Sequence, residues 1–305
     1  MDEAKHAEIV VIGAGPGGYA AAFRAADLGK QVLLIDRDPE LGGVCLNRGC
    51  IPSKALLHIS KVMDETSHLE KMGVTYGDPE IDLNVVQTHK NKIVSQLNSG
   101  IAQLAKARKV ETLQGLASFV SNTELKVKTG TGDIPITFNQ CIIAAGSTSA
   151  MIPGIPSEHP SVLTSRTALD LEDVPERLLV IGGGVIGLEI GQVYATFGSS
   201  VSVVEFLPNL LPGTDPDLVK PLQRKLKKQF ELILVSSKVT KAELRGDETL
   251  TVTIKNDNGT TKEIFNKILV SVGRKPNTGL LNIEATDVKV KKDGFIDVDV
   301  YQRTS

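Results

Sequence analysis

Two glycine-rich segments constrain the fold of this chain more than any other feature. The first, GAGPGG at residues 13–18, follows the apolar run 8–12, and the second, GGGVIG at residues 182–187, follows the apolar run 177–181. In both cases a run of small or apolar residues comes next, which is typical of a helix. A buried strand, a glycine turn and a helix in this order form the dinucleotide-binding fingerprint. The repeat of the whole pattern therefore predicts two α/β domains with parallel sheets and two dinucleotide sites.

The glycines and the acids that follow them have distinct roles in such a fingerprint. The first glycine makes the turn, the second lets a pyrophosphate approach, and the third lets helix and strand pack closely. These glycines are Gly13, Gly15 and Gly18 in the first fingerprint and Gly182, Gly184 and Gly187 in the second. Asp36 and Glu205 each end the next apolar run and can accept hydrogen bonds from a ribose. Because residues 206–214 contain no Lys or Arg, the second site should prefer NAD over NADP.

A short stretch with two cysteines, GGVCLNRGCIPSK at residues 42–54, lies between the fingerprints. Cys45 and Cys50 could form half of a zinc site, but Cys141 alone remains and no His/Cys pair completes the ligand set. They could instead form a structural disulfide, which a chain of this size does not need. A thiol close to Lys54 and to a helix N-terminus tends toward the reactive thiolate. The neighbouring fingerprints favour a disulfide that opens and closes during turnover.

The rest of the chain predicts ordinary secondary structure around these motifs. Helices are expected over residues 51–72 and 84–108, and a small antiparallel meander is expected over residues 111–119, 124–128 and 134–138. Residues 141–147 read as a further strand, in which Cys141 behaves as a small core residue. The three prolines of residues 151–160 indicate a linker. We therefore expect one dinucleotide-binding domain at 1–150, a second one that prefers NAD at 151–276 and a last segment at 277–305.

Composition excludes several classes of protein. The 305 residues carry a formal net charge of −2, with 41% hydrophobic and 23% charged residues, so nothing favours nucleic-acid binding. No apolar run approaches the roughly 20 residues of a membrane span. The first eight residues are polar and unlike a targeting peptide. We expect a cytoplasmic protein, in which a disulfide is more often catalytic than structural.

Taken in order, these motifs resemble the FAD-dependent pyridine nucleotide-disulfide oxidoreductases, and within that family the dihydrolipoamide dehydrogenases. The resemblance covers essentially the whole chain and rests on residues 13–18, 42–54, 144–147, 182–189, 205 and 273–277. It implies FAD at the first fingerprint and NAD at the second. It also implies that Cys45 attacks the dithiol substrate, that Cys50 exchanges electrons with the flavin, and that Lys54 pairs with Glu189 near the flavin.

The resemblance implies further contacts and partners. Besides the six fingerprint glycines, it implies that the cofactors are lined by Asp36, Arg37, Gly43, Val44, Cys45, Lys54, Ala117, Ala145, Gly146, Ser147, Val185, Ile186, Glu189, Glu205, Val239, Gly273 and Arg274. It implies no metal. The partners would be lipoyl domains of 2-oxo acid dehydrogenase complexes or of the glycine cleavage system, and the full-length form would be a homodimer.

The chain departs from the family pattern at Asp36, Arg48 and its end. Close relatives often carry Glu at the position of Asp36, which keeps the acceptor. The sequence stops before the family's second FAD segment and its dimerisation domain, and none of the five histidines has an acid five residues later. We therefore expect a fragment that lacks the catalytic base and turns over dihydrolipoamide poorly. The alternatives are a reductase of the glutathione or mercuric type, and a redox-silent nucleotide-binding module.

Arg48 lies between the cysteines, where the family pattern has an apolar or small residue. It is either a solvated side chain or a charge that lowers the pKa of a neighbouring thiol. Titration of thiolate absorbance in an Arg48→Val variant separates the two, because an unchanged thiol pKa would leave only the solvated side chain.

Overall fold

The computed structural model describes residues 5–305 and divides into two compact units. Unit 1 comprises the chain up to Asn47 together with Val94–Thr148 and Lys275–Ser305, and unit 2 comprises Arg48–Ile93 and Ser149–Arg274. Each unit is thus assembled from segments that are distant in sequence. Two helices, α2 (Gly43–Arg48) and α4 (Leu83–Ala107), contain residues of both units. The boundaries expected from the sequence, 1–150, 151–276 and 277–305, follow the cofactor motifs rather than the compactness of the units, so they stay a prediction.

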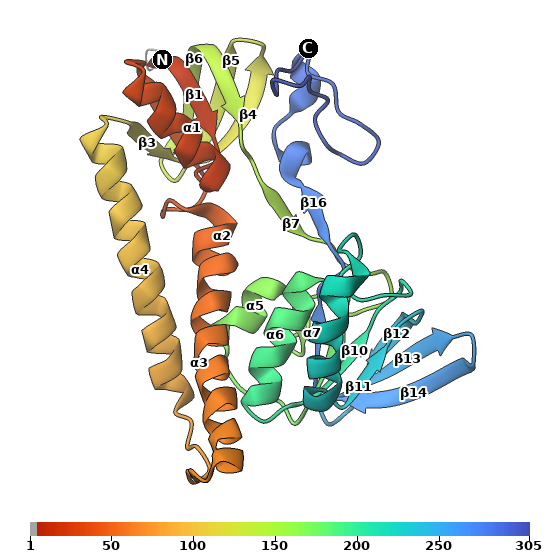
Figure 1. Cartoon of the computed structure of the whole chain (residues 1–305). Helices are drawn as coiled ribbons and strands as arrows, with labels where there is room; N and C mark the ends of the chain where they lie inside the picture. Colours follow the sequence, from red (N-terminus) through yellow and green to blue (C-terminus); the bar gives the residue numbers. More distant parts are fainter. Residues whose placement is uncertain (1–4) are drawn as a thin grey trace. The chain divides into compact units, whose positions relative to one another are not determined.

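Unit 1 is built on a six-stranded sheet in which parallel and antiparallel pairs meet at β6. The spatial order is β3 (Glu111–Gln114), β2 (Val32–Asp36), β1 (Lys5–Ile12), β6 (Gly132–Ile143), β5 (Glu124–Thr129) and β4 (Leu116–Ser121). The pairs β3·β2, β2·β1 and β1·β6 are parallel, whereas β6·β5 and β5·β4 are antiparallel. Helix α1 (Pro16–Asp27) lies against this sheet (Figure 1). The predicted α/β class with an inserted antiparallel meander is confirmed.

The strand boundaries in the second half of this sheet differ from those expected. The segment expected at 111–119 is two strands, and β3 joins the parallel part of the sheet as its edge strand. Gly115 lies between β3 and β4, where a Cβ would be only 2.5 Å from Val127 Cγ1. The strand expected at 134–138 and the first three residues of the strand expected at 141–147 form one continuous strand, β6, which ends at Ile143. It pairs with β5 through its first half and with β1 along most of its length.

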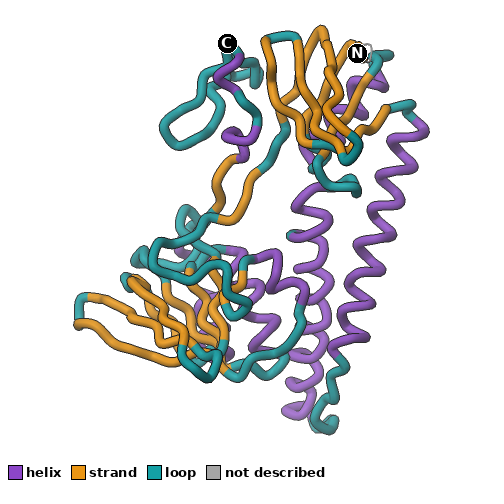
Figure 2. Tube along the Cα trace, turned by 180° about the vertical axis from the view of Figure 1, so that it is seen from behind, coloured by secondary structure: helices purple, strands orange, loops and turns teal. Residues whose placement is uncertain are grey.

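Unit 2 has a parallel five-stranded sheet between a layer of helices and a second, antiparallel sheet. The parallel sheet has the order β11 (Leu232–Leu234), β10 (Ser200–Val204), β9 (Arg177–Ile181), β15 (Lys267–Val270) and β8 (Val162–Leu163). Its helices are α3 (Cys50–His68), α5 (Ser165–Asp170), α6 (Val185–Thr196) and α7 (Pro216–Gln229). The antiparallel sheet, which we did not expect, contains β12 (Lys238–Leu244), β13 (Leu250–Asn256) and β14 (Gly259–Phe265). In the tube drawing, these three strands are the outermost orange segments of unit 2 (Figure 2).

Alternation along β9 explains why unit 2 has two hydrophobic layers. Leu178 and Val180 point into the cluster formed with the helices, whereas Leu179 and Ile181 point into the cluster formed with the antiparallel sheet. Successive side chains of a strand face opposite sides of a sheet, so a strand buried on both faces is apolar at every position. All four of these side chains are at most 4% exposed.

Short segments complete the chain. The 3-10 helices are η1 (Leu69–Met72), η2 (Asn277–Leu280) and η3 (Ile283–Ala285), and β7 (Ser147–Ser149) pairs with β16 (Arg274–Pro276). The helices expected at 51–72 and 84–108 correspond to α3 with η1 and to α4. Within residues 5–305, none of the helices combines the length and the apolarity that crossing a membrane requires.

The short helix α5 is held at its C-terminal end by side chains from two other helices. Lys90 Nζ on α4 donates to the Leu169 carbonyl at 2.6 Å, and Gln87 Nε2 donates to the Leu171 carbonyl at 2.7 Å. Tyr194 OH on α6 donates to the Ala168 carbonyl at 2.9 Å. The last carbonyls of a helix have no partner within it, so these donors satisfy them. Burial lowers the pKa of Lys90, which is only 5% exposed.

We predict that Lys90→Met lowers the free energy of unfolding by about 1–3 kcal/mol, because the Leu169 carbonyl would be buried without a donor. Urea titration followed by circular dichroism measures this. Lys92→Met, at an exposed position of the same helix, should change stability by under about 0.5 kcal/mol. Equal effects of both substitutions would contradict the capping role.

We predict that Cys141 resists alkylation in the native protein. It lies in β6, partly buried against the hydrophobic core of unit 1, and burial raises its pKa to about 12, so the thiol is protonated at pH 8. Iodoacetamide labelling at pH 8, read by peptide mass spectrometry, should modify Cys50 but not Cys141. In urea both should react at the same rate, and rapid native labelling of Cys141 would show that its strand opens.

Candidate functional site

The first glycine turn lies where three parallel strands of unit 1 end. Gly13 has a φ of +99°, and a Cβ on it would overlap the carbonyl of Ala144 just beyond β6. A Cβ on Gly18 would overlap the Gly13 carbonyl. By contrast, the nearest atom to a Cβ on Gly15 would be 3.9 Å away. The turn therefore has no room for side chains at its base and leaves open space at the middle glycine, where a pyrophosphate would approach.

Asp36 is tied to this turn by its own hydrogen bonds. Its Oδ2 accepts from the Ala14 amide at 2.6 Å, and its Oδ1 accepts from the Asp38 amide at 2.9 Å. The carboxylate is thus fixed at the end of β2, facing the strand–helix turn. A carboxylate at this position is of the kind that accepts hydrogen bonds from a ribose.

The second turn repeats this geometry in unit 2. Gly182 has a φ of +109°, and a Cβ on it would lie 2.5 Å from the carbonyl oxygen of Ser271. A Cβ on Gly187 would lie at the same distance from Ser271 Oγ, whereas no atom lies within 4 Å of a Cβ on Gly184. Helix α6 starts here, with exposed Val185 and Ile186 in its first turn. The N-terminus of this helix is open to an anionic group.

Glu205 is the counterpart of Asp36 and is more deeply buried. It is 7% exposed, and its Oε2 accepts from the Gly183 amide at 2.5 Å while its Oε1 accepts from the Leu207 amide at 2.7 Å. A fixed carboxylate and the absence of Lys and Arg from residues 206–214 suit a ribose diol and oppose a 2′-phosphate. The residues of both turns therefore fit dinucleotides, and the second fits NAD.

The cysteine stretch begins directly on the first turn. A Cβ on Gly43 would lie 2.5 Å from Gly15 Cα, and the Gly42 amide donates to the Ala14 carbonyl at 2.8 Å. Cys45 follows on α2, where it is partly buried. Asn98 Nδ2 donates to Asn47 Oδ1 at 2.5 Å, which holds this short helix against α4. Cys45 is thus carried on a segment that contacts the first glycine turn.

Cys50 is the first residue of α3 and is exposed. The division between the two units falls after Asn47, so Cys45 belongs to unit 1 and Cys50 to unit 2, and both are thiols in the structure. Pro52 lies in the first turn of α3, where its missing N–H costs nothing. Arg48, at the end of α2, is partly buried.

Lys54 and Glu189 are brought together by α3 and α6. Lys54 Nζ lies 2.7 Å and 2.8 Å from the two carboxylate oxygens of Glu189. The packing of Leu56 on α3 into the cluster that contains Leu188 and Val180 sets the two helices side by side (Figure 1). The Lys54 side chain is 58% exposed, so the pair adds little to stability by itself. The ion pair instead holds the Lys54 ammonium in place, four residues after Cys50.

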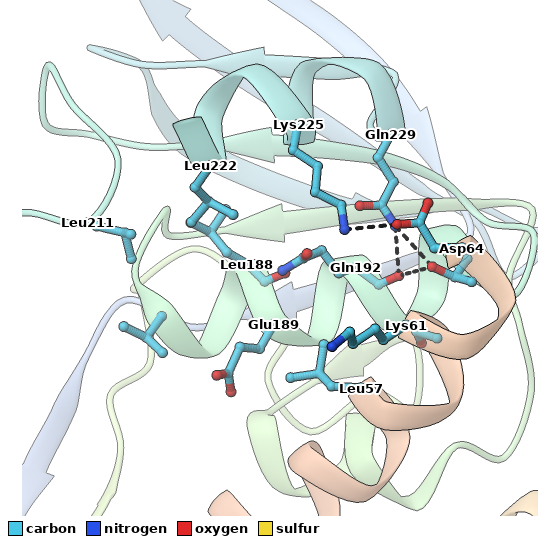
Figure 3. A pocket seen from close by; sticks show the side chains of 13 residues that line it. Leu57, Lys61, Asp64, Leu188, Glu189, Gln192, Leu211, Leu222, Lys225 and Gln229 are labelled. Carbon is cyan, nitrogen blue, oxygen red and sulfur yellow. Dashed lines mark hydrogen bonds and ion pairs between the residues drawn. The ribbon is translucent and has the colours of Figure 1, made fainter. Parts of the chain in front are cut away.

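A hollow of about 360 Å³ lies beside this ion pair. It is lined by side chains of α3, α6 and α7, including Leu57, Leu188 and Leu222, with Glu189 at its edge (Figure 3). Lys225 of α7 reaches Asp64 of α3 at 2.9 Å across it. The hollow therefore lies within unit 2, close to the predicted site but outside the glycine turn.

The remaining predicted residues lie in different environments. The side chains of Ala117 and Val239 are at most 3% exposed, within the cores of units 1 and 2, so only their backbones could reach a ligand. Arg37, Gly146 and Gly273 are exposed, whereas Val44, Ala145, Ser147 and Arg274 are partly buried. Burial lowers the pKa of Arg274. Among the described residues, no group of three or more His, Cys, Asp or Glu side chains could hold a metal ion.

Sequence reasoning missed Ser53. It is 6% exposed, and its hydroxyl lies 3.0 Å from the Cys50 carbonyl and 3.5 Å from Glu189 Oε2. The signal available in the sequence was its position between Cys50 and Lys54, but the partner on α6 becomes apparent only in the structure.

Comparisons with known proteins agree on one family. The family model described as pyridine nucleotide-disulphide oxidoreductase matches residues 7–305. Dihydrolipoyl dehydrogenase of Vibrio cholerae is 42% identical over the whole chain, and that of Geobacillus stearothermophilus is 41% identical over the whole chain. The chain spans 64% of the length of each of these relatives.

A solved structure extends the comparison to the fold. The Cu(II) complex of the HOCl-induced flavoprotein disulfide reductase RclA from Escherichia coli superposes with a TM-score of 0.83 at 26% sequence identity, over 99% of this chain and 64% of that one. The two glycine turns, the cysteine stretch and these matches lead to one conclusion: the chain belongs to the pyridine nucleotide-disulphide oxidoreductase family.

Proposed function

We propose that this chain is the FAD- and NAD-binding part of a dihydrolipoyl dehydrogenase. The observation that carries the proposal is the contact of Gly43 with Gly15, because it sets the segment that carries Cys45 on a phosphate-binding turn. The similarity to curated dihydrolipoyl dehydrogenases supports the substrate class. A cytoplasmic location suits catalytic thiols in a reducing compartment.

The chain's own residues would carry the sulfur chemistry. A dihydrolipoyl dithiol would reduce the Cys45–Cys50 disulfide by two exchange steps, in which the substrate becomes a cyclic disulfide and both cysteines become thiols. Cys45 would bond to the substrate sulfur, and Cys50 would be the leaving thiolate. FAD and NAD, when bound, would supply the route by which the two electrons leave the cysteines.

The two turns would bind and orient the cofactors. The open glycines and the helix N-termini of α1 and α6 would receive the pyrophosphates, while Asp36 and Glu205 would accept from the adenosine riboses. Lys54, held by Glu189, would present its ammonium close to Cys50. The base that takes the proton of the substrate thiol is proposed to lie in the part of the relatives that this sequence does not span.

The proposed partners follow from the substrate. They are the lipoyl domains of 2-oxo acid dehydrogenase complexes or of the glycine cleavage system, with a homodimer as the full-length form. A second candidate is a disulfide reductase with a different substrate, which the superposition on RclA favours. Reduction of the cysteine pair by dihydrolipoamide, but not by reduced glutathione, would separate the first candidate from the second.

We predict that Glu205→Gln destabilises unit 2 and weakens NADH binding. A glutamine has one acceptor oxygen in place of two, so either the Gly183 or the Leu207 amide loses its partner, at a cost of about 1–3 kcal/mol in the free energy of unfolding. Urea unfolding and NADH titration by fluorescence measure the two effects. Glu231→Gln, at an exposed position, serves as the control. Tighter binding of NADPH than of NADH by the wild-type chain would refute the proposed role of Glu205.

We predict that the FAD-loaded chain develops a long-wavelength absorbance band when anaerobic dihydrolipoamide is added, because Cys50 becomes a thiolate beside the flavin. Thiol counting by mass spectrometry should show the reduction of one disulfide between Cys45 and Cys50. A Cys50→Ser variant should bind FAD equally well but give no band. A chain that binds NADH and never retains FAD would instead be a nucleotide-binding module.

A further inference from the structure

We propose that Ser53 is a positioning residue of the redox centre: its buried hydroxyl fixes the Glu189 carboxylate, and through it the Lys54 ammonium, relative to Cys50. The proposal deepens the proposed function, because it rests on Cys50 being a reacting thiol. It concerns residues of unit 2 alone, on helices α3 and α6.

The first step of the argument is the position of Ser53 on α3. The buried residues of this helix are Pro52, Ser53, Leu56 and Ser60. Ser53, Leu56 and Ser60 have the spacing of one helix face. Leu56 packs into the cluster of α6 side chains, so this face meets α6. A hydroxyl there is removed from water and needs a partner within the protein.

The second step is that the Ser53 hydroxyl has one proton and two acceptors. The Cys50 carbonyl is 3.0 Å from Ser53 Oγ, and Glu189 Oε2 is 3.5 Å from it. By sharing its proton between these acceptors, the Ser53 hydroxyl connects the first turn of α3, which carries Cys50, to the Glu189 carboxylate on α6. Glu189 in turn holds Lys54 through both of its oxygens. Cys50, Ser53, Glu189 and Lys54 thus form one connected set.

The third step is the effect on Cys50. Lys54 follows Cys50 by four residues, so the two side chains lie on the same face of the helix, where the ammonium attracts the negative charge of a sulfur that is reacting. The Lys54 side chain is 58% exposed and that of Glu189 is 23% exposed. Without the Ser53 hydroxyl, the ion pair is free to turn toward water. The ammonium then spends less time near Cys50, and Cys50 reacts more slowly.

A simpler explanation of Ser53 is that only a small side chain fits where α3 meets α6. Ser60 provides the matched comparison, because it lies on the same face of α3, is 4% exposed and donates to the Leu56 carbonyl of its own helix. No carboxylate contact accompanies that bond among the described residues. If size alone mattered, alanine would replace either serine without effect on Cys50.

The test measures alkylation of Cys50 by iodoacetamide at pH 7.5 in the reduced chain without cofactors, read by peptide mass spectrometry. We expect Ser53→Ala to lower the rate constant about threefold, the effect of losing a weak hydrogen bond, and Ser60→Ala to leave it unchanged. In a Glu189→Gln background, Ser53→Ala should add nothing further, because its effect passes through Glu189. Circular dichroism confirms that each variant is folded.

Three results would overturn the proposal. They are an unchanged rate in Ser53→Ala, an equal loss in Ser60→Ala, and a full additional loss in the Glu189→Gln background. Failure of the proposed function is measured separately, as the inability of dihydrolipoamide to reduce a Cys45–Cys50 disulfide in the wild-type chain. Because the alkylation experiment contains neither substrate nor cofactor, its result does not depend on that outcome.

Discussion

The glycine turns after β1 and β9 depend on a steric constraint that glycine alone meets. At Gly13 and Gly182 the backbone has a positive φ, and the carbonyl of the residue that follows the neighbouring strand occupies the space of a Cβ. Any side chain would push apart the strands whose ends form the site. The open middle glycines and the exposed helix N-termini follow from this close approach. A similar constraint applies at Gly43, because a Cβ there would lie 2.5 Å from Gly15 Cα. The lack of a side chain at Gly43 therefore allows the cysteine stretch to contact the first turn.

The acids at the ends of the second strands join recognition to folding. Asp36 and Glu205 each accept a backbone amide from the second residue of the glycine turn. Each carboxylate is therefore ordered before any ribose arrives, which reduces the entropy cost of binding. The same bonds explain why exchange for an amide should reduce both stability and affinity. The two fingerprints share this arrangement although one ends in Asp and the other in Glu.

Much of the fold and the site could be predicted from the sequence, because short motifs with strict local geometry encode them. The strand–glycine–helix units and the helix expected from residue 51 belong to this kind, whereas the Lys54–Glu189 pair was implied by the family resemblance. The parallel pairing of β3 could not be predicted, since its four residues have no distinctive pattern and its partner strand β2 lies far earlier in the sequence, with Leu33 paired to Glu111. The sheet β12–β14 could not be predicted either. Its alternating apolar side chains pack against β9 and β15, and this contact becomes apparent only in the structure. Ser53 was missed because its role depends on Glu189, which lies 136 residues later on another helix.

The discontinuous make-up of unit 1 also bears on how the chain folds during synthesis. Strand β1 pairs with β6 in a register that joins Lys5 to Ile136, and Leu281 and Ile283 complete the same core, with the Phe119 amide donating to the Leu281 carbonyl at 2.7 Å. A ribosome must therefore deliver nearly the whole of unit 2 before the core of unit 1 can close. Until then its apolar strands remain candidates for pairing with other chains. All of unit 2 has been synthesised once residue 274 is in place, whereas the core of unit 1 is complete only after Leu281 and Ile283 have followed.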